Sequence, residues 1–129
     1  MNNKNTKYLL NKYSKLFRQH KLSIQESAMP WLFQCDDGWY WLINILCSQL
    51  QHDIDKNKEP QLEFNTIKEK FGTLRIYCDG SSDRQDGMIA LIEFMSGYTC
   101  EYCGSTEDIK QTKGYIHSLC KKCINIERR

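Results

Sequence analysis

Three stretches of the chain place apolar residues every three or four positions, which is the spacing of one face of a helix. They predict helices over about residues 5–19, 39–54 and 88–95. The first stretch carries lysines and an arginine between its apolar positions, so it predicts an amphipathic helix with a basic face. Such a face is most often simply solvated, although it also suits a phosphate backbone or an acidic partner.

Polar residues mark the starts of the second and third helices. Asp36 and Asp37 precede the second helix, where a carboxylate can accept hydrogen bonds from the free amides of the first turn. Ser82 and Gln85 have the spacing of a capping box before the third helix, which is expected to end near Gly97. These residues therefore predict where both helices begin.

The first half of the second helix is predicted to lie inside the protein. Trp41 and Ile45 widen its apolar face onto a second side, which predicts contacts with two other layers. The aromatic run at residues 39–41 also suits base stacking, but an aromatic run entering an apolar helix favours a core position. Before this helix, Pro30 breaks the helical pattern and predicts a loop at residues 29–31.

Between the second and third helices the pattern changes to the alternation of a β-strand. Residues 62–66 and 74–78 each alternate apolar with polar side chains. Residues 68–72 are short enough to join two antiparallel strands, and Gly72 is free to take a positive φ there. The sequence thus predicts a hairpin, alone or within a slightly larger sheet, and the fold class is α+β with about three helices and a small antiparallel sheet.

Two C-x-x-C pairs near the end of the chain predict a zinc site. The four cysteines are Cys100, Cys103, Cys120 and Cys123. Two residues between cysteines allow a tight turn to bring both sulfurs onto one ion at about 2.3 Å. Sixteen residues separate the two pairs, a spacing found in tetrahedral zinc sites. A redox dithiol and an iron cluster are the less favoured alternatives.

The expected role of this zinc ion is structural. Four thiolates fill a tetrahedral ion, whereas a catalytic zinc keeps one position open. His117 is an alternative ligand, although a place in the hairpin or a hydrogen bond to a ligand is favoured for it. Residues 108–118 predict a β-hairpin between the pairs, so residues 100–129 are expected to form a zinc-ribbon-like segment packed on a core of residues 1–99.

A second candidate site surrounds the predicted hairpin turn. Lys68, Lys70 and Arg75 place three cations near backbone amides, which suits a phosphate or a carboxylate. Tyr77 and His117 are further candidate ligand-binding residues if the fold brings them to the same end. The alternative is a solvated turn with local ion pairing, and this interpretation is favoured.

Composition and charge narrow the classes of protein to which the chain can belong. The 129 residues carry a formal charge of +2, which is too small to imply nucleic acid by itself. No apolar run is long enough for a membrane span or a secretory signal, so we expect a cytoplasmic protein with no membrane partner. Cys35, Cys47 and Cys78 are then expected to be reduced, mostly buried thiols. No catalytic residues are predicted, which favours a non-enzymatic protein without excluding an enzyme.

Four motifs together resemble a group of short, functionally uncharacterised proteins encoded by bacteria and their phages. The motifs are Gly38-Trp-Tyr-x-Leu-Ile-x-x-Leu-Cys47, Lys68-Glu-Lys-Phe-Gly-x-Leu-Arg-x-Tyr77, Asp86-Gly87 with its apolar helix, and the pair of Cys100-x-x-Cys-Gly104 with Cys120-x-x-Cys123. The resemblance covers roughly residues 29–123. It departs from the group at Thr73, where members often have a second glycine.

The resemblance implies a zinc-bearing accessory protein, encoded by a phage or another mobile element, that acts on a host factor or as counter-defence. Combined with the residues themselves, it favours a small zinc-binding protein that binds a macromolecular partner, most simply a protein. The alternative is a nucleic-acid or nucleotide binder that uses a basic surface. The sequence leaves the oligomeric state open.

Overall fold

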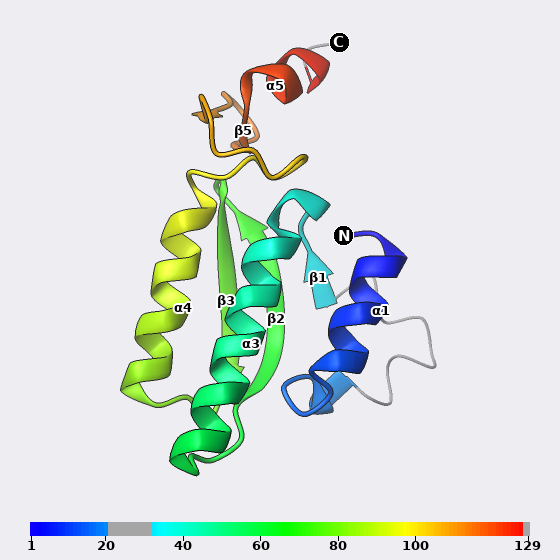
Figure 1. The fold of residues 1–129 in the computed structure, drawn as a ribbon. Coiled ribbons are helices and arrows are strands. Elements are labelled where there is room, and N and C mark those ends of the chain that lie inside the picture. Colours follow the sequence, from blue (N-terminus) through cyan, green and yellow to red (C-terminus); the bar gives the residue numbers. More distant parts are fainter. Residues whose placement is uncertain (21–31, 128–129) are drawn as a thin grey trace.

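The computed structural model describes residues 1–20 and 32–127, and within them the fold is α+β, as the sequence predicts (Figure 1). The α-helices are α1 (Asn3–Lys12), α3 (Tyr40–Asn57), α4 (Asp83–Ser96) and α5 (Lys121–Glu127). The strands are β1 (Phe33–Gln34), β2 (Glu63–Lys70), β3 (Thr73–Asp79), β4 (Lys110–Gln111) and β5 (Ser118–Leu119). Short 3₁₀ helices cover Arg18–His20 and Asp37–Trp39.

The predicted hairpin forms two strands of a three-stranded sheet with the order β1-β2-β3. β2 and β3 are antiparallel, and β1 adds to β2 in the parallel direction. The turn consists of Phe71 and Gly72, which both have a positive φ, as a two-residue hairpin turn requires. The connecting segment predicted at residues 68–72 is therefore too long, because Lys68 and Lys70 belong to β2 itself.

The free edge of β3 is covered by α4. The backbone amide of Leu74 donates a hydrogen bond to Ser96 Oγ at 2.8 Å, and that of Ile76 donates to Glu93 Oε2 at 2.9 Å. These side chains satisfy amides that an exposed edge strand would leave unpaired.

The capping box of Ser82 and Gln85 is present at the start of α4, so this prediction is confirmed. In Figure 1, α4 and α3 lie side by side, and α1 lies on the opposite flank of the molecule.

The first predicted helix is shorter than expected. α1 ends at Lys12, and a turn and a 3₁₀ helix follow in place of a helix that continues to residue 19. The helix ends early because the chain turns after it and buries Leu16 and Phe17 in the core. The carbonyl of Leu16 accepts a hydrogen bond from the amide of Phe64 in β2 at 2.8 Å, which an ongoing helix would prevent.

Two predictions about the second helix are wrong. Asp36 and Asp37 do not cap α3; instead, the Asp37 carboxylate accepts hydrogen bonds from the backbone and side chain of Asn2 and so fixes the start of α1. Trp41 is 64% exposed and Ile45 is 37% exposed, because the described part of the chain leaves this side of α3 uncovered. The loop predicted at residues 29–31 lies outside the described residues.

Candidate metal centre

Each C-x-x-C pair sits in a tight local turn. In the first pair, the amide of Gly104 donates to the carbonyl of Cys100 at 2.9 Å, and Gly104 has a φ of +83°. A side chain there would be strained, which explains the glycine after the second cysteine. The second pair, Cys120 and Cys123, lies at the start of α5, so one helical turn sets its spacing. Both turns bring two sulfurs to the same side of the backbone.

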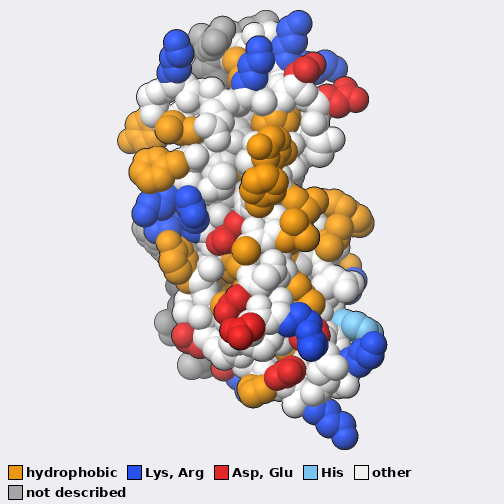
Figure 2. All heavy atoms as spheres, turned by 90° about the vertical axis from the view of Figure 1, so that its left-hand side faces the viewer, with side chains coloured by type: hydrophobic (Ala, Val, Ile, Leu, Met, Phe, Trp, Pro, Cys, Tyr) orange, Lys and Arg blue, Asp and Glu red, His pale blue; other side chains and the backbone are white. Residues whose placement is uncertain are grey.

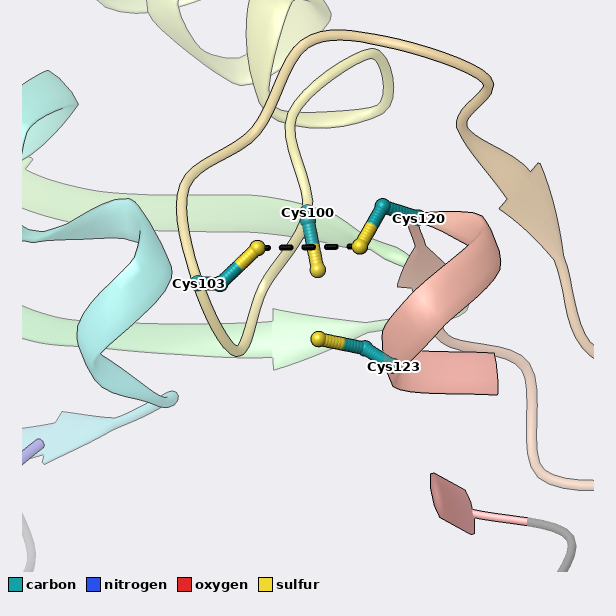
Figure 3. Close-up of side chains that lie close together, drawn as sticks. All are labelled: Cys100, Cys103, Cys120 and Cys123. Atoms are coloured by element: carbon teal, nitrogen blue, oxygen red, sulfur yellow. Dashed lines mark hydrogen bonds between the residues drawn. The ribbon is translucent and has the colours of Figure 1, made fainter. Parts of the chain in front are cut away.

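The four thiols converge on one point, as Figure 3 shows. This cysteine cluster consists of Cys100, Cys103, Cys120 and Cys123, whose sulfur atoms lie within 4.8 Å of one another. Cys103 Sγ and Cys120 Sγ are 3.6 Å apart. A tetrahedral zinc ion with bonds of about 2.3 Å holds its sulfurs about 3.8 Å apart. The donor set and its spacing therefore fit a zinc ion.

The surroundings of the cluster shift the pKa values of its thiols in opposite directions. The backbone amide of Cys123 donates toward Cys120 Sγ and lowers the pKa of this thiol to about 7. Burial raises the pKa of Cys123 above its ordinary value, and the neighbouring sulfurs raise it further. One thiol is thus ready to ionise, whereas full ionisation of all four needs a cation among them.

The segment between the pairs is the predicted hairpin. β4 and β5 pair antiparallel, with Lys110 opposite Leu119. The amide of Thr112 donates to the carbonyl of His117 at 2.9 Å and closes the turn region. Leu119 is fully buried and packs with three of the four clustered cysteines. The apolar core of this segment is therefore very small.

Backbone contacts join the cysteine segment to the start of α3. The amide of Gly38 donates to the carbonyl of Glu101 at 2.7 Å, and Trp39 Nε1 donates to the carbonyl of Thr99 at 2.9 Å. A Cβ on Gly38 would come within 2.1 Å of the carbonyl oxygen of Cys100, so only glycine fits. Ser118 Oγ donates to the carbonyl of Gly72 at 2.6 Å and fixes the other side to the β2–β3 turn. The division at residue 99 remains a prediction.

The candidate ligand-binding residues fall into two groups. Lys68 and Arg75 are cross-strand partners on the outer face of the sheet, and Lys68 Nζ lies 5.7 Å from the ring centroid of Tyr77. Lys70 reaches over the ring of Phe71 at 5.8 Å. His117 is not part of this group, because its Nδ1 atom faces two glutamates instead. The expected gathering of all five residues does not occur.

Those two glutamates are Glu69 and Glu101, neither of which the sequence analysis predicts as a metal ligand. His117 Nδ1 is 3.0 Å from Glu101 Oε1 and 3.6 Å from Glu69 Oε1. Burial raises the pKa of Glu101, and the hydrogen bond with His117 partly offsets this rise. The only sequence signal was the place of Glu101 inside the first C-x-x-C pair, and nothing in the pattern pairs it with residue 69.

Fold and cluster together define a small α+β protein with four cysteines at metal-binding distance. A comparison of the chain with protein-family models, with curated proteins and with solved structures found no match. The resemblance to bacterial and phage proteins therefore stays a prediction. None of the described helices is long and apolar enough to cross a bilayer.

Proposed function

We propose that this is a small zinc-stabilised protein that acts by binding another protein. The observation that carries this proposal is an apolar face, exposed on two neighbouring helices next to the cysteine segment. Its members come from the first turns of α3, from the outer side of α4 and from the turn that follows α4. They are Trp41, Ile45, Leu91, Phe94, Met95 and Tyr98.

The side chains of this apolar face are neighbours that form one patch, unlike isolated apolar residues on a surface. Trp41, Leu91, Phe94 and Tyr98 are each at least 60% exposed. The rings of Phe94 and Tyr98 lie 5.2 Å apart, so they form one surface. Figure 2 shows hydrophobic side chains gathered along the face of α4 that points to the viewer. Large contiguous apolar patches on soluble proteins are typical of protein interfaces, and aromatic side chains contribute most of the binding energy there.

The charges near the apolar face favour an acidic partner. Figure 2 shows basic side chains beside the apolar stripe, on the sheet side of α4. Lys68 and Arg75 are cross-strand partners on the outer face of the sheet. A partner segment with apolar side chains and flanking acidic residues would match both surfaces. A role against a host factor is part of this proposal and rests only on the resemblance.

The zinc ion supports this function by holding the cysteine segment in place. We infer that zinc binds the four thiolates and has a structural role, because they fill its coordination sphere. The segment buries too little apolar surface to fold without the ion. The Cys103→Ser variant should bind about one zinc ion less per chain than the wild type. The matched variant Cys78→Ser, which changes a thiol outside the cluster, should retain the full zinc content.

Site-specific photo-crosslinking in the cells that produce the protein tests the partner proposal. A photoreactive phenylalanine analogue at Phe94 should form an adduct with one other polypeptide. The same analogue at Tyr8, an exposed aromatic of α1, is the control and should not form this adduct. Leu91→Asp should abolish the adduct, because a charge in the apolar face opposes burial. Equal adducts from both positions, or an adduct with a second copy of the chain alone, would contradict the proposal.

A second function, nucleic-acid binding, is favoured by one specific observation. The outer face of the sheet presents Lys68, Lys70 and Arg75 together with the exposed rings of Phe71 and Tyr77. Cations that alternate with aromatic rings are typical of single-strand binding surfaces. Binding to random RNA and DNA over a salt series tests it, and a steep loss of affinity with salt would support it. No binding at low salt would remove it.

A further inference from the structure

We propose that Glu69, Glu101 and His117 bind a second divalent metal ion, separate from the cysteine cluster. The ion expected from these ligands is zinc, manganese or iron(II), because imidazole and carboxylate suit ions of intermediate softness. The site is independent of the proposed partner binding. We call these three residues the glutamate–histidine group.

The glutamate–histidine group is assembled from three separate segments. Glu69 lies near the end of β2, opposite Leu74, and therefore on the inner face of the sheet. Glu101 belongs to the first C-x-x-C turn, and His117 to the hairpin just before β5. Three segments far apart in sequence thus bring one ligand atom each to the same point.

The distances fit one metal ion. Bonds of about 2.0–2.2 Å to oxygen and nitrogen in a tetrahedral site place ligand atoms about 3.3–3.6 Å apart. The observed distances from His117 Nδ1 are 3.0 Å to Glu101 and 3.6 Å to Glu69, and all three ligand atoms lie within 4.8 Å of one another. Only small side-chain movements would therefore place an ion among them.

Two of the ligands are already held in position by other contacts. Glu101 is only 2% exposed, and its second carboxylate oxygen accepts a hydrogen bond from the amide of Asp36 at 3.3 Å. The amide of Glu101 donates to the carbonyl of Ser118, which fixes it to β5. The amide of His117 donates to Thr112 Oγ1 at 2.9 Å. Ligands held by such outer contacts lose little entropy when a metal binds.

One side of the group is open to a hollow of about 560 Å³. The three ligands line this hollow together with Gln34, Cys35 and Asp36, among others. Among the described lining residues, the only permanent cation is the terminal ammonium of Met1, which donates to the carbonyl of Cys35. The wall therefore favours a cation. Three protein ligands with a free fourth position are typical of catalytic rather than structural zinc sites.

Metal analysis of the whole protein tests this inference. The zinc-loaded wild type should contain about two ions per chain, and Glu69→Gln should contain about one. Gln keeps the shape of the side chain but removes the charged ligand oxygen. Glu107→Gln, which changes an exposed acid of the same segment, is the matched control and should retain both ions.

Cobalt substitution separates the two sites by their ligands. Cobalt bound by thiolates gives sulfur-to-metal charge-transfer bands, whereas a site of nitrogen and oxygen gives only weaker d–d bands. The Glu69→Gln and His117→Ala variants should lose the d–d bands of the glutamate–histidine group and keep the charge-transfer bands of the cysteine cluster. The bands that remain also show that the variants are folded. One ion per wild-type chain, two ions in both variants, or loss of both sets of bands together would overturn the proposal.

Discussion

The core and the cysteine segment are stabilised in different ways. In the core, the described residues before Cys100 bury large side chains such as Phe17, Trp39 and Phe64 in one continuous apolar cluster. In the cysteine segment, residues 100–127, the buried apolar residues are Leu119 and three of the cysteines. A core of that size offsets little of the entropy lost on folding. The comparison teaches that one region is held by packing, whereas the other has four thiols at metal-binding distance in place of a large apolar core.

The two regions nevertheless meet without a flexible linker. The backbone of Gly38, just before α3, touches the first C-x-x-C turn. Gly104 approaches it from the other side, since a Cβ added to Gly104 would lie 3.2 Å from the carbonyl oxygen of Gly38. Loss of the metal should therefore affect the cysteine segment first and the contacts at Gly38 second. The variants below are designed to separate these effects.

The largest effect on the core is expected from Phe64→Ala. Phe64 is fully buried, and its ring lies 5.2 Å from that of Phe17. Removing the ring leaves a cavity and should lower the free energy of unfolding by about 3–5 kcal/mol. Urea unfolding followed by far-ultraviolet circular dichroism measures this loss. The metal content of the folded variant should stay unchanged; a parallel loss of metal would mean that the two regions fold as one unit.

A smaller effect is expected from Gly38→Ala at the junction. The new methyl group would meet the carbonyls of Cys100 and Glu101, so the segment must shift, at a cost of about 1–3 kcal/mol. Amide exchange in residues 100–127 should become faster than in the core. Gly87→Ala in α4 is the matched control: nothing lies near its Cβ position, and it should stabilise the helix by about 0.5–1 kcal/mol. Equal effects of the two variants would contradict the close junction.

The smallest effect is expected from Asp53→Asn, in α3 and outside the cysteine segment. Arg84, and then Gln85 and Asn57, donate hydrogen bonds to the Asp53 carboxylate and hold its pKa below the ordinary value. A lowered pKa in the folded protein stabilises it above the pKa of the unfolded state, and this contribution is lost as the pH falls through the folded value. Asn should therefore lower the urea midpoint at pH 7, and the difference from wild type should shrink below about pH 4. A difference that does not vary with pH would contradict this ion pair.

The parts of the fold that were predictable depend on local pattern. The capping box at Ser82 and the cysteine pairs are short-range signals, and the α+β class was predicted correctly from the periodicity of apolar residues. Exposure was less predictable, because the same spacing describes a buried face and an uncovered one. Trp41 shows this, since only the placement of α4 and the sheet decides which sides of α3 are covered.

The glutamate–histidine group was not predictable for a related reason. Glu69, Glu101 and His117 have no fixed spacing in the sequence, and the docking of the cysteine segment on the β2–β3 turn alone brings them together. By contrast, the cysteine cluster depends on two local turns, each with its own spacing. Sites built from local turns can be read from a sequence, whereas sites built by tertiary contacts need the structure.

The most direct measurement is hydrogen exchange of the native protein before and after removal of the metal by a strong chelator. Exchange in residues 100–127 should rise at least about a hundredfold, because even about 3 kcal/mol of metal-coupled stability changes an equilibrium constant that much. The amides of β2, β3 and α4 should keep most of their protection. Unchanged exchange in the cysteine segment, with its thiols freely reactive in the native state, would contradict the account.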